Sequence, residues 1–346
     1  MKQHEREYFI SRIRSGIYTL KVNGLTLKIM QPTIEEEFEI NQIFQESYLQ
    51  ALEDDFMTEE QALEFMIDRG LWCEKDDEKI EGLKKDIERL KVEIYNARNN
   101  DRLKQEIRAY LRTGEKQLKK QNEKKSMFFT NTCEGIAILE KSFAFLKRCT
   151  FLNNALFDFE SVGIEDVLNT YYSMILTEST VRELARNEPW RSLWALNVSN
   201  SFDIFANKNR ELSPDQKSLL VWSKMYDNIQ ESIEAPSEDV INDDDMLDGW
   251  FIIQRKKREK QQAESELENT VKNDKIKNSS EIFVMAGSKK DAQRINNMND
   301  IGGKIVKQQR ENLVKQKGDV TQNEFQDEKV KLSSQSQQMF KDKFRR

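Results

Sequence analysis

The chain has 346 residues, of which 34% are charged and 37% are hydrophobic, with only 12 glycines and 4 prolines. This composition fits long exposed helices and argues against a turn-rich all-β fold. Its apolar runs fall far short of the roughly 20 residues that a membrane helix needs. The start, Met1 to Glu7, lacks the apolar stretch of a signal peptide. We therefore expect a mainly α protein without membrane spans that is not secreted by a signal peptide.

Charge is divided unevenly along the chain. Residues 251–346 contain 22 Lys and Arg against 14 Asp and Glu, a net charge of +8. The preceding 250 residues contain 33 against 47, a net charge of −14. An acidic body with a basic tail leaves three roles open for the tail: binding nucleic acid, binding an acidic partner, or contacting its own body.

Residues 1–75 are predicted to combine a β-hairpin with helices. Alternating apolar residues over 17–22 and 25–30 flank Asn23-Gly24. This is the strongest short hairpin signal, because both turn positions need a positive φ. The shared apolar face would consist of Tyr18, Leu20, Val22, Leu25, Leu27 and Ile29.

A helix follows the hairpin. Pro32 precedes Thr33, and Thr33 with Glu36 forms a capping box. We expect Phe38, either Ile43 or Phe44, and Leu52 on the buried face of this helix. A lone hairpin is marginally stable in water, so we also expect it to pack on this helix around Phe38 and Phe44.

Residues 76–125 contain a heptad pattern broken once by Asn99-Asn100. Apolar residues before the break recur at steps of 3 and 4: Ile80, Leu83, Ile87, Leu90 and Ile94. A second apolar face follows the break: Leu103, Ile107, either Tyr110 or Leu111, and Leu118. Two amphipathic helices joined by a short polar break predict an antiparallel helical hairpin, a coiled-coil stalk that projects from the body. Such a stalk serves interaction and assembly.

Residues 126–253 hold most of the large apolar side chains and are predicted to form a helical body. Five of its residues form an arginine and tryptophan patch: Arg182, Arg186, Trp190, Arg191 and Trp194. Core tryptophans beside solvated arginines, a protein interface, and a nucleic-acid surface are all compatible with this pattern. We select Arg182, Arg186, Trp190 and Arg191 as candidate partner-binding residues.

Five aspartates, Asp239, Asp243, Asp244, Asp245 and Asp248, crowd the segment before Gly249-Trp250. Clustered carboxylates suit a hard cation, but their spacing differs from a calcium loop, in which glycine directly follows the third ligand. We expect a solvated acidic loop, with a contact surface for basic residues and a metal site as the alternatives.

Residues 254–346 are predicted to be an extended basic tail that becomes ordered only against a partner, because its composition buries too little apolar surface to fold alone. A short apolar island is the candidate anchor: Ile282, Phe283, Val284 and Met285. The basic cluster Arg255, Lys256, Lys257 and Arg258 is either a solvated helix start or a nonspecific phosphate contact.

Residues for metal binding or nucleophilic catalysis are scarce. Cys73, Cys133 and Cys149 have no metal-ligand spacing, and His4 is the only histidine. The chain therefore lacks the ligand set of a zinc site, and the scarcity of histidine argues against a catalytic Cys-His or Ser-His pair. The sequence predicts no catalytic, cofactor-binding or metal-binding residue.

The segment from Tyr18 to Ile29 with Pro32-Thr33-Ile34-Glu35-Glu36 resembles the opening of tailed-bacteriophage tail-assembly chaperones, in which a short β-hairpin precedes a Pro-Thr-x-Glu-Glu helix start. The resemblance lies mainly in residues 17–50. Stretches from Arg182 to Arg191 and from Asp248 to Trp250 look like uncharacterised phage structural proteins. The chain departs from the chaperones in its greater length, its stalk and its basic tail. No functional residue carries over, because those chaperones have no catalytic motif.

We therefore expect a non-enzymatic assembly or structural adaptor protein of a tailed phage, in tail or neck assembly. It would bind other assembly or virion proteins through its stalk and C-terminal tail, in the host cytoplasm or in the virion, without a cofactor. An oligomer is compatible with this role. The alternative is a nucleic-acid-associated protein that uses the basic tail.

Overall fold

The computed structural model describes residues 1–160, 162–197, 204–206 and 209–270, with the single residues 293, 307, 308, 311, 312, 315 and 318. The chain divides into two units, Met1–Gln254 and Arg255–Arg346. The proposed anchor at 282–285 lies outside the described residues, as does most of the basic tail.

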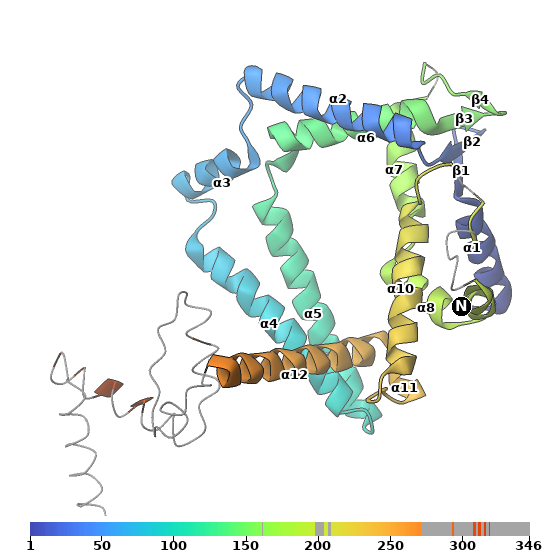
Figure 1. Ribbon diagram of the computed structural model, residues 1–346. Helices are drawn as coiled ribbons and strands as arrows, with labels where there is room; N and C mark the ends of the chain where they lie inside the picture. The colour runs from blue at the N-terminus through green and yellow to red at the C-terminus, as the bar shows by residue number, and fades with distance from the viewer. Residues whose placement is uncertain are drawn as a thin grey trace, which may run out of the picture. The chain divides into compact units, whose positions relative to one another are not determined.

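The described chain is mainly helical, with one small sheet (Figure 1). Its helices are α1 (Gln3–Ser15), α2 (Ile34–Glu53), α3 (Glu59–Asp68), α4 (Glu74–Asn96), α5 (Asp101–Lys125), the 3₁₀ turn η1 (Phe129–Asn131), α6 (Cys133–Cys149), α7 (Ile164–Met174), α8 (Glu178–Arg186), α9 (Trp190–Leu196), α10 (Pro214–Glu231), α11 (Glu238–Ile241) and α12 (Asp244–Thr270). Helix α12 begins in the first unit and continues into the second.

The sheet is antiparallel and has the strand order β1-β2-β3-β4. Strands β1 (Ile17–Val22) and β2 (Leu25–Met30) form the predicted hairpin, with Leu20 opposite Leu27. Both turn residues have the expected positive φ, 48° at Asn23 and 79° at Gly24. A second hairpin, which was not expected from the sequence, consists of β3 (Thr150–Leu152) and β4 (Ala155–Leu156) and pairs with β2 through β3.

The apolar face of the first hairpin is buried as predicted, but its packing partner differs. Tyr18, Leu20, Leu27 and Ile29 form a cluster with residues of α6 and α7, among them Leu146, Val167 and Tyr171. The expected contact with Phe38 is wrong, because this side chain is 63% exposed. The hydrophobic effect requires only that the hairpin bury its apolar face, and residues of α6 and α7 cover that face.

Helix α2 begins at the predicted capping box, in which Thr33 Oγ1 accepts a hydrogen bond from the Glu36 amide. It lies beside α6 (Figure 1) and is tied to it by the ion pair Arg148–Glu39 at 3.2 Å. Its buried residues are Ile40 and Ala51. The expectation that Phe38 and Leu52 form its buried face is therefore wrong.

Helices α4 and α5 form an antiparallel pair, in agreement with the predicted helical hairpin (Figure 1). At its open end, Lys125 pairs with Asp77 at 2.8 Å, and Trp72, Met66 and Ile80 form a small apolar cluster. At its turn end, Ile94, Ile107 and Leu111 join the largest core cluster among the described residues. The hairpin is therefore held at both ends, and the expectation of a projecting stalk is wrong.

The largest core cluster is built from α1, the turn end of the hairpin, and α8 to α12. Trp190 stacks near Trp194 and Phe205, with ring centroids 6.2 Å apart in both pairs. Helix α10 begins after Ser213, which forms a capping box with Gln216, and Pro214 occupies the first turn. This core brings the acidic start of α12 beside the helical hairpin and α8.

Candidate functional site

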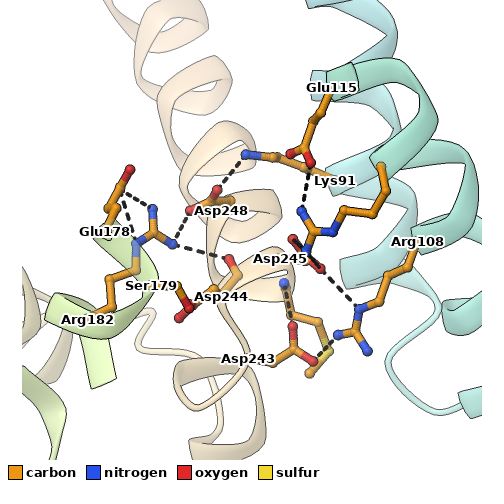
Figure 2. A network of polar contacts seen from close by, with 12 residues as sticks. Lys91, Arg108, Glu115, Glu178, Ser179, Arg182, Asp243, Asp244, Asp245 and Asp248 are labelled. Atoms are coloured by element: carbon orange, nitrogen blue, oxygen red, sulfur yellow. Dashed lines mark hydrogen bonds and ion pairs between the residues drawn. The ribbon is translucent and has the colours of Figure 1, made fainter. Parts of the chain in front are cut away.

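A network of ion pairs lies at the start of α12 (Figure 2). We call Asp243, Asp244, Asp245 and Asp248 the acidic cluster. Asp243 Oδ1 accepts a hydrogen bond from the Met246 amide at 3.2 Å, which satisfies an amide in the first turn of the helix. Negative charge is also favourable at a helix N-terminus. Local helix-start chemistry thus explains why these aspartates lie here.

Cationic side chains of the helical hairpin contact one side of the acidic cluster (Figure 2). Lys91 Nζ on α4 donates to Asp248 at 2.6 Å. From α5, Arg108 donates to Asp243 and to Asp245, the latter at 3.1 Å. Arg112 donates to both carboxylate oxygens of Asp245, at 2.9 and 3.1 Å. These pairs fix the hairpin against α12.

Arginines of α8 contact the other side of the cluster. Arg182 donates to Asp248 at 2.7 Å and to Glu178 at 2.8 Å, and its guanidinium lies 4.0 Å from the centre of the Trp222 ring. Arg186 donates to Asp244 at 2.6 Å. Burial lowers the pKa of Arg182, but Asp248 and Glu178 more than offset this, so that its pKa lies above the usual arginine value. The charge of Arg182 is thereby retained in a largely buried position.

Gly249 allows α12 to approach α4 closely. A Cβ atom at this position would overlap the backbone carbonyl oxygen of Lys91 and would lie 2.9 Å from Tyr95 Cβ. The next residue, Trp250, is 6% exposed and belongs to the largest core cluster. The sequence Asp248-Gly249-Trp250 therefore supplies an ion-pair partner, a close backbone contact and a core side chain in succession.

A second polar site joins the largest core cluster to the sheet. Asp215 on α10 is 2% exposed and accepts hydrogen bonds from Arg12 Nη2 at 2.8 Å and from the Leu176 amide at 2.9 Å. The same Arg12 nitrogen donates to the Met174 carbonyl oxygen at 3.0 Å. The Arg12 guanidinium also lies 5.5 Å from the centre of the Tyr18 ring on β1. This pair connects α1, β1, α10 and the end of α7.

A hollow of about 480 Å³ lies among α2, α3, η1 and the end of α5. Its lining includes the aromatic residues Tyr48, Phe128 and Phe129 and the acidic residues Glu59 and Glu134. The Glu134 carboxylate accepts a hydrogen bond from the Glu59 amide at 2.8 Å, so it caps the first turn of α3. The Glu134 carboxylate therefore stabilises the framework of this hollow.

The structure places the predicted partner-binding residues of the body inside it. Trp190 is fully buried and donates from Nε1 to Ser223 Oγ at 2.7 Å, and Arg182 is 8% exposed. Arg186 pairs with Asp244, and Arg191 pairs with Asp227 at 2.9 Å. These four side chains stabilise the core and are not displayed as a surface patch. The basic residues 255–258, in contrast, are exposed on α12.

The acidic segment also differs from its expected form. A solvated loop is wrong for Asp245, which is 8% exposed. The alternative, a contact surface for basic residues, is what the structure contains, and the basic residues belong to the same chain. Lys91, Arg108 and Arg112 could not be recognised from the sequence, because they occupy polar positions of a heptad pattern whose outer face is normally solvated.

Across the residues that the structure describes, no three His, Cys, Asp or Glu side chains are grouped to hold a metal ion. Among the same residues, no helix is both long enough and apolar enough to cross a bilayer.

The ion pairs of the acidic cluster join α12 to the helical hairpin and to α8. The chain matches no protein-family model, no curated protein and no solved structure.

Proposed function

We propose that this protein is a non-enzymatic assembly or structural adaptor that binds other proteins through the segment beginning at Arg255. The observation that carries the proposal is the change in environment along α12. Its first turns are held in place by the ion pairs of the acidic cluster and by the buried side chains of Leu247 and Trp250. From 255 to 262 every residue of the same helix is exposed.

A helix that is polar on all sides has no face to bury in its own domain. Here such a helix continues directly from a segment fixed by ion pairs and core packing. The charge of residues 255–346 is +8, with 22 Lys and Arg against 14 Asp and Glu. A basic segment attached to a rigid base is suited to capturing an acidic partner surface, because its attachment point is already ordered.

The assembly role in a tailed phage is part of the same proposal. Its support is the resemblance of residues 17–36 to tail-assembly chaperones, namely the hairpin and the Pro-Thr-x-Glu-Glu helix start. The charged side chains that the sequence singled out, in the acidic cluster and on α8, serve to join helices, which supports a structural role.

A chain ending at Gln254 tests the proposal. We expect it to keep the circular-dichroism spectrum and melting temperature of the full chain, while a pull-down from the native source with mass spectrometry shows the loss of partner proteins. A truncated chain that retains the same partners would refute the proposal. A truncated chain that fails to fold would show that residues beyond Gln254 belong to the core, which also contradicts it.

The exposed cluster Arg255, Lys256, Lys257 and Arg258 supports a second candidate, nonspecific nucleic-acid binding. If these four cations contact phosphates, the logarithm of affinity for duplex DNA should fall with the logarithm of salt concentration with a slope of about −3.6. Replacing all four by glutamine should remove this dependence. Protein partners that remain bound to the glutamine variant would favour the adaptor role over this candidate.

A further inference from the structure

Helix α2 carries a second apolar face that its own fold leaves exposed. Ile34, Phe38, Leu49 and Leu52 are 75%, 63%, 56% and 45% exposed, respectively. They are separated by 4, 11 and 3 residues, and at 100° per residue these steps return to one side of an α-helix. The buried residues of α2, Ile40 and Ala51, lie on a different side. The exposed stripe is therefore distinct from the face that packs on α6.

The stripe extends over nearly the whole helix. From Ile34 to Leu52 it covers about 27 Å at 1.5 Å per residue. Asn41 and Gln45, which are exposed on the same side, separate its two apolar ends. Lys141 of α6 donates to Asn41 Oδ1 at 2.7 Å, which fixes the amide at the centre of the stripe. Apolar contacts at both ends and amides in the middle form a long, straight surface.

A row of acidic residues borders the stripe. Glu35, Glu46 and Glu53 each directly follow a residue on the stripe and are exposed. Their steps of 11 and 7 residues keep them on one side of the helix. The helix contains six glutamates and no lysine or arginine. The apolar stripe is thus flanked along its length by negative charge.

We propose that this face of α2 binds a basic amphipathic helix of a partner protein. A helix lying along a straight stripe presents apolar anchors at i, i+3, i+4 and i+7, and lysines or arginines beside these anchors would meet the acidic row. A second copy of this chain is a poorer occupant, because two α2 faces would bring two acidic rows together. An anionic lipid surface would be repelled by the same charge.

The proposal is independent of the segment beginning at Arg255, and it is tested with the full chain. A library of random 20-residue peptides is selected on the wild-type protein and counter-selected on a Phe38→Gln, Leu49→Gln double variant. Peptides with apolar residues at helical spacing and an excess of Lys and Arg are expected. One recovered peptide is then titrated by fluorescence anisotropy.

We expect the double variant to bind this peptide at least tenfold more weakly, whereas Val221→Gln, at a 58% exposed position of α10, binds it like the wild type. A Glu35→Gln, Glu46→Gln, Glu53→Gln variant should weaken binding and reduce its salt dependence. Recovery of acidic peptides, or equal binding by the double variant, would overturn the proposal. So would self-association or binding to anionic vesicles that the double variant abolishes, since the occupant would then be a second copy or a membrane.

Discussion

At the residue scale, Asp248 and Gly249, in the same turn of α12, stabilise the contact with neighbouring helices in two different ways. The Asp248 carboxylate draws Lys91 and Arg182 toward the helix through hydrogen bonds of 2.6 and 2.7 Å. Gly249 removes the side chain that would keep α4 away. Attraction between charges is useful only if the backbones can approach, so the two residues depend on each other.

Gly249→Ala should destabilise the protein. The added methyl group meets the backbone of α4, which cannot rotate away as a side chain could, and we expect a loss of about 1–3 kcal/mol in the free energy of unfolding. Urea unfolding followed by circular dichroism measures it. Gly82→Ala is the control, because a Cβ there has nothing within 4 Å and alanine favours a helix interior by about 0.5–1 kcal/mol. Equal effects of the two substitutions would contradict the close contact.

The Cys149 thiol should make stability fall at alkaline pH. Burial raises its pKa from 9.0 to about 12. Between these values the unfolded chain loses the thiol proton while the folded chain keeps it, so the free energy of unfolding decreases by about 1.4 kcal/mol per pH unit from this group. Urea unfolding from pH 8 to 11 should show a shallower decline in Cys149→Ala than in the wild type. Parallel declines would show that this thiol is not the cause.

At the scale of elements, the helical hairpin α4–α5 acts as a brace between two core clusters. Its open end contributes Ile80 to the cluster around Trp72. Its turn end contributes Ile94 and Leu111 to the largest cluster, and its cations bind the acidic cluster. A heptad surface normally serves pairing of two helices, and here its outer positions also connect distant parts of one chain.

Leu111→Ala should separate the turn end of the hairpin from the core. Leu111 is fully buried, and we expect its truncation to cost about 2–5 kcal/mol. Leu103→Ala lies on the same helix but removes a side chain that is 42% exposed, so its cost should stay below about 1 kcal/mol. Chemical denaturation of both variants provides the comparison. A small effect of Leu111→Ala on stability would instead support the earlier expectation that the hairpin projects from the body.

Elements with local signals could be predicted from the sequence, whereas their packing partners could not. Asn23-Gly24 specifies a hairpin turn, and Thr33 and Ser213 specify helix starts, because in each case the deciding groups lie within a few residues. Lys91 and Asp248, in contrast, are 157 residues apart. Periodicity indicates which residues share a face, but not which element covers it. Phe38 shows the difference, since its spacing suits a core and its side chain is exposed.

At the scale of the whole molecule, the buried pair Arg12–Asp215 connects the two larger apolar clusters. Side-chain exposure is 11% for Arg12 and 2% for Asp215. Tyr18, beside Arg12, belongs to the cluster under the sheet, and α10 belongs to the largest cluster. Residues 203 positions apart are thus joined where the N-terminal helix meets the body.

Asp215→Asn should therefore destabilise the whole first unit. Loss of the carboxylate leaves the Arg12 charge buried without its partner, which costs about 3–5 kcal/mol. Thermal unfolding by circular dichroism, with Trp fluorescence as a second probe, should show a lower and still single transition. Lys217→Gln is the control, because Lys217 is 59% exposed in its pair with Glu211, and it should change stability by less than about 0.5 kcal/mol. Two separate transitions in Asp215→Asn would show that the clusters unfold independently.

The fixing of the hairpin at both ends also limits how this chain can change in length. Because α4 and α5 are antiparallel, residues inserted into one helix must be matched by residues in the other, or the pairs at 76–77 and 124–125 lose their register. Even a matched insertion lengthens the brace, which moves Lys91 and Arg108 away from the aspartates of α12. Insertions and deletions should therefore be tolerated outside this hairpin, in surface turns such as Asn153-Asn154, far more readily than within it.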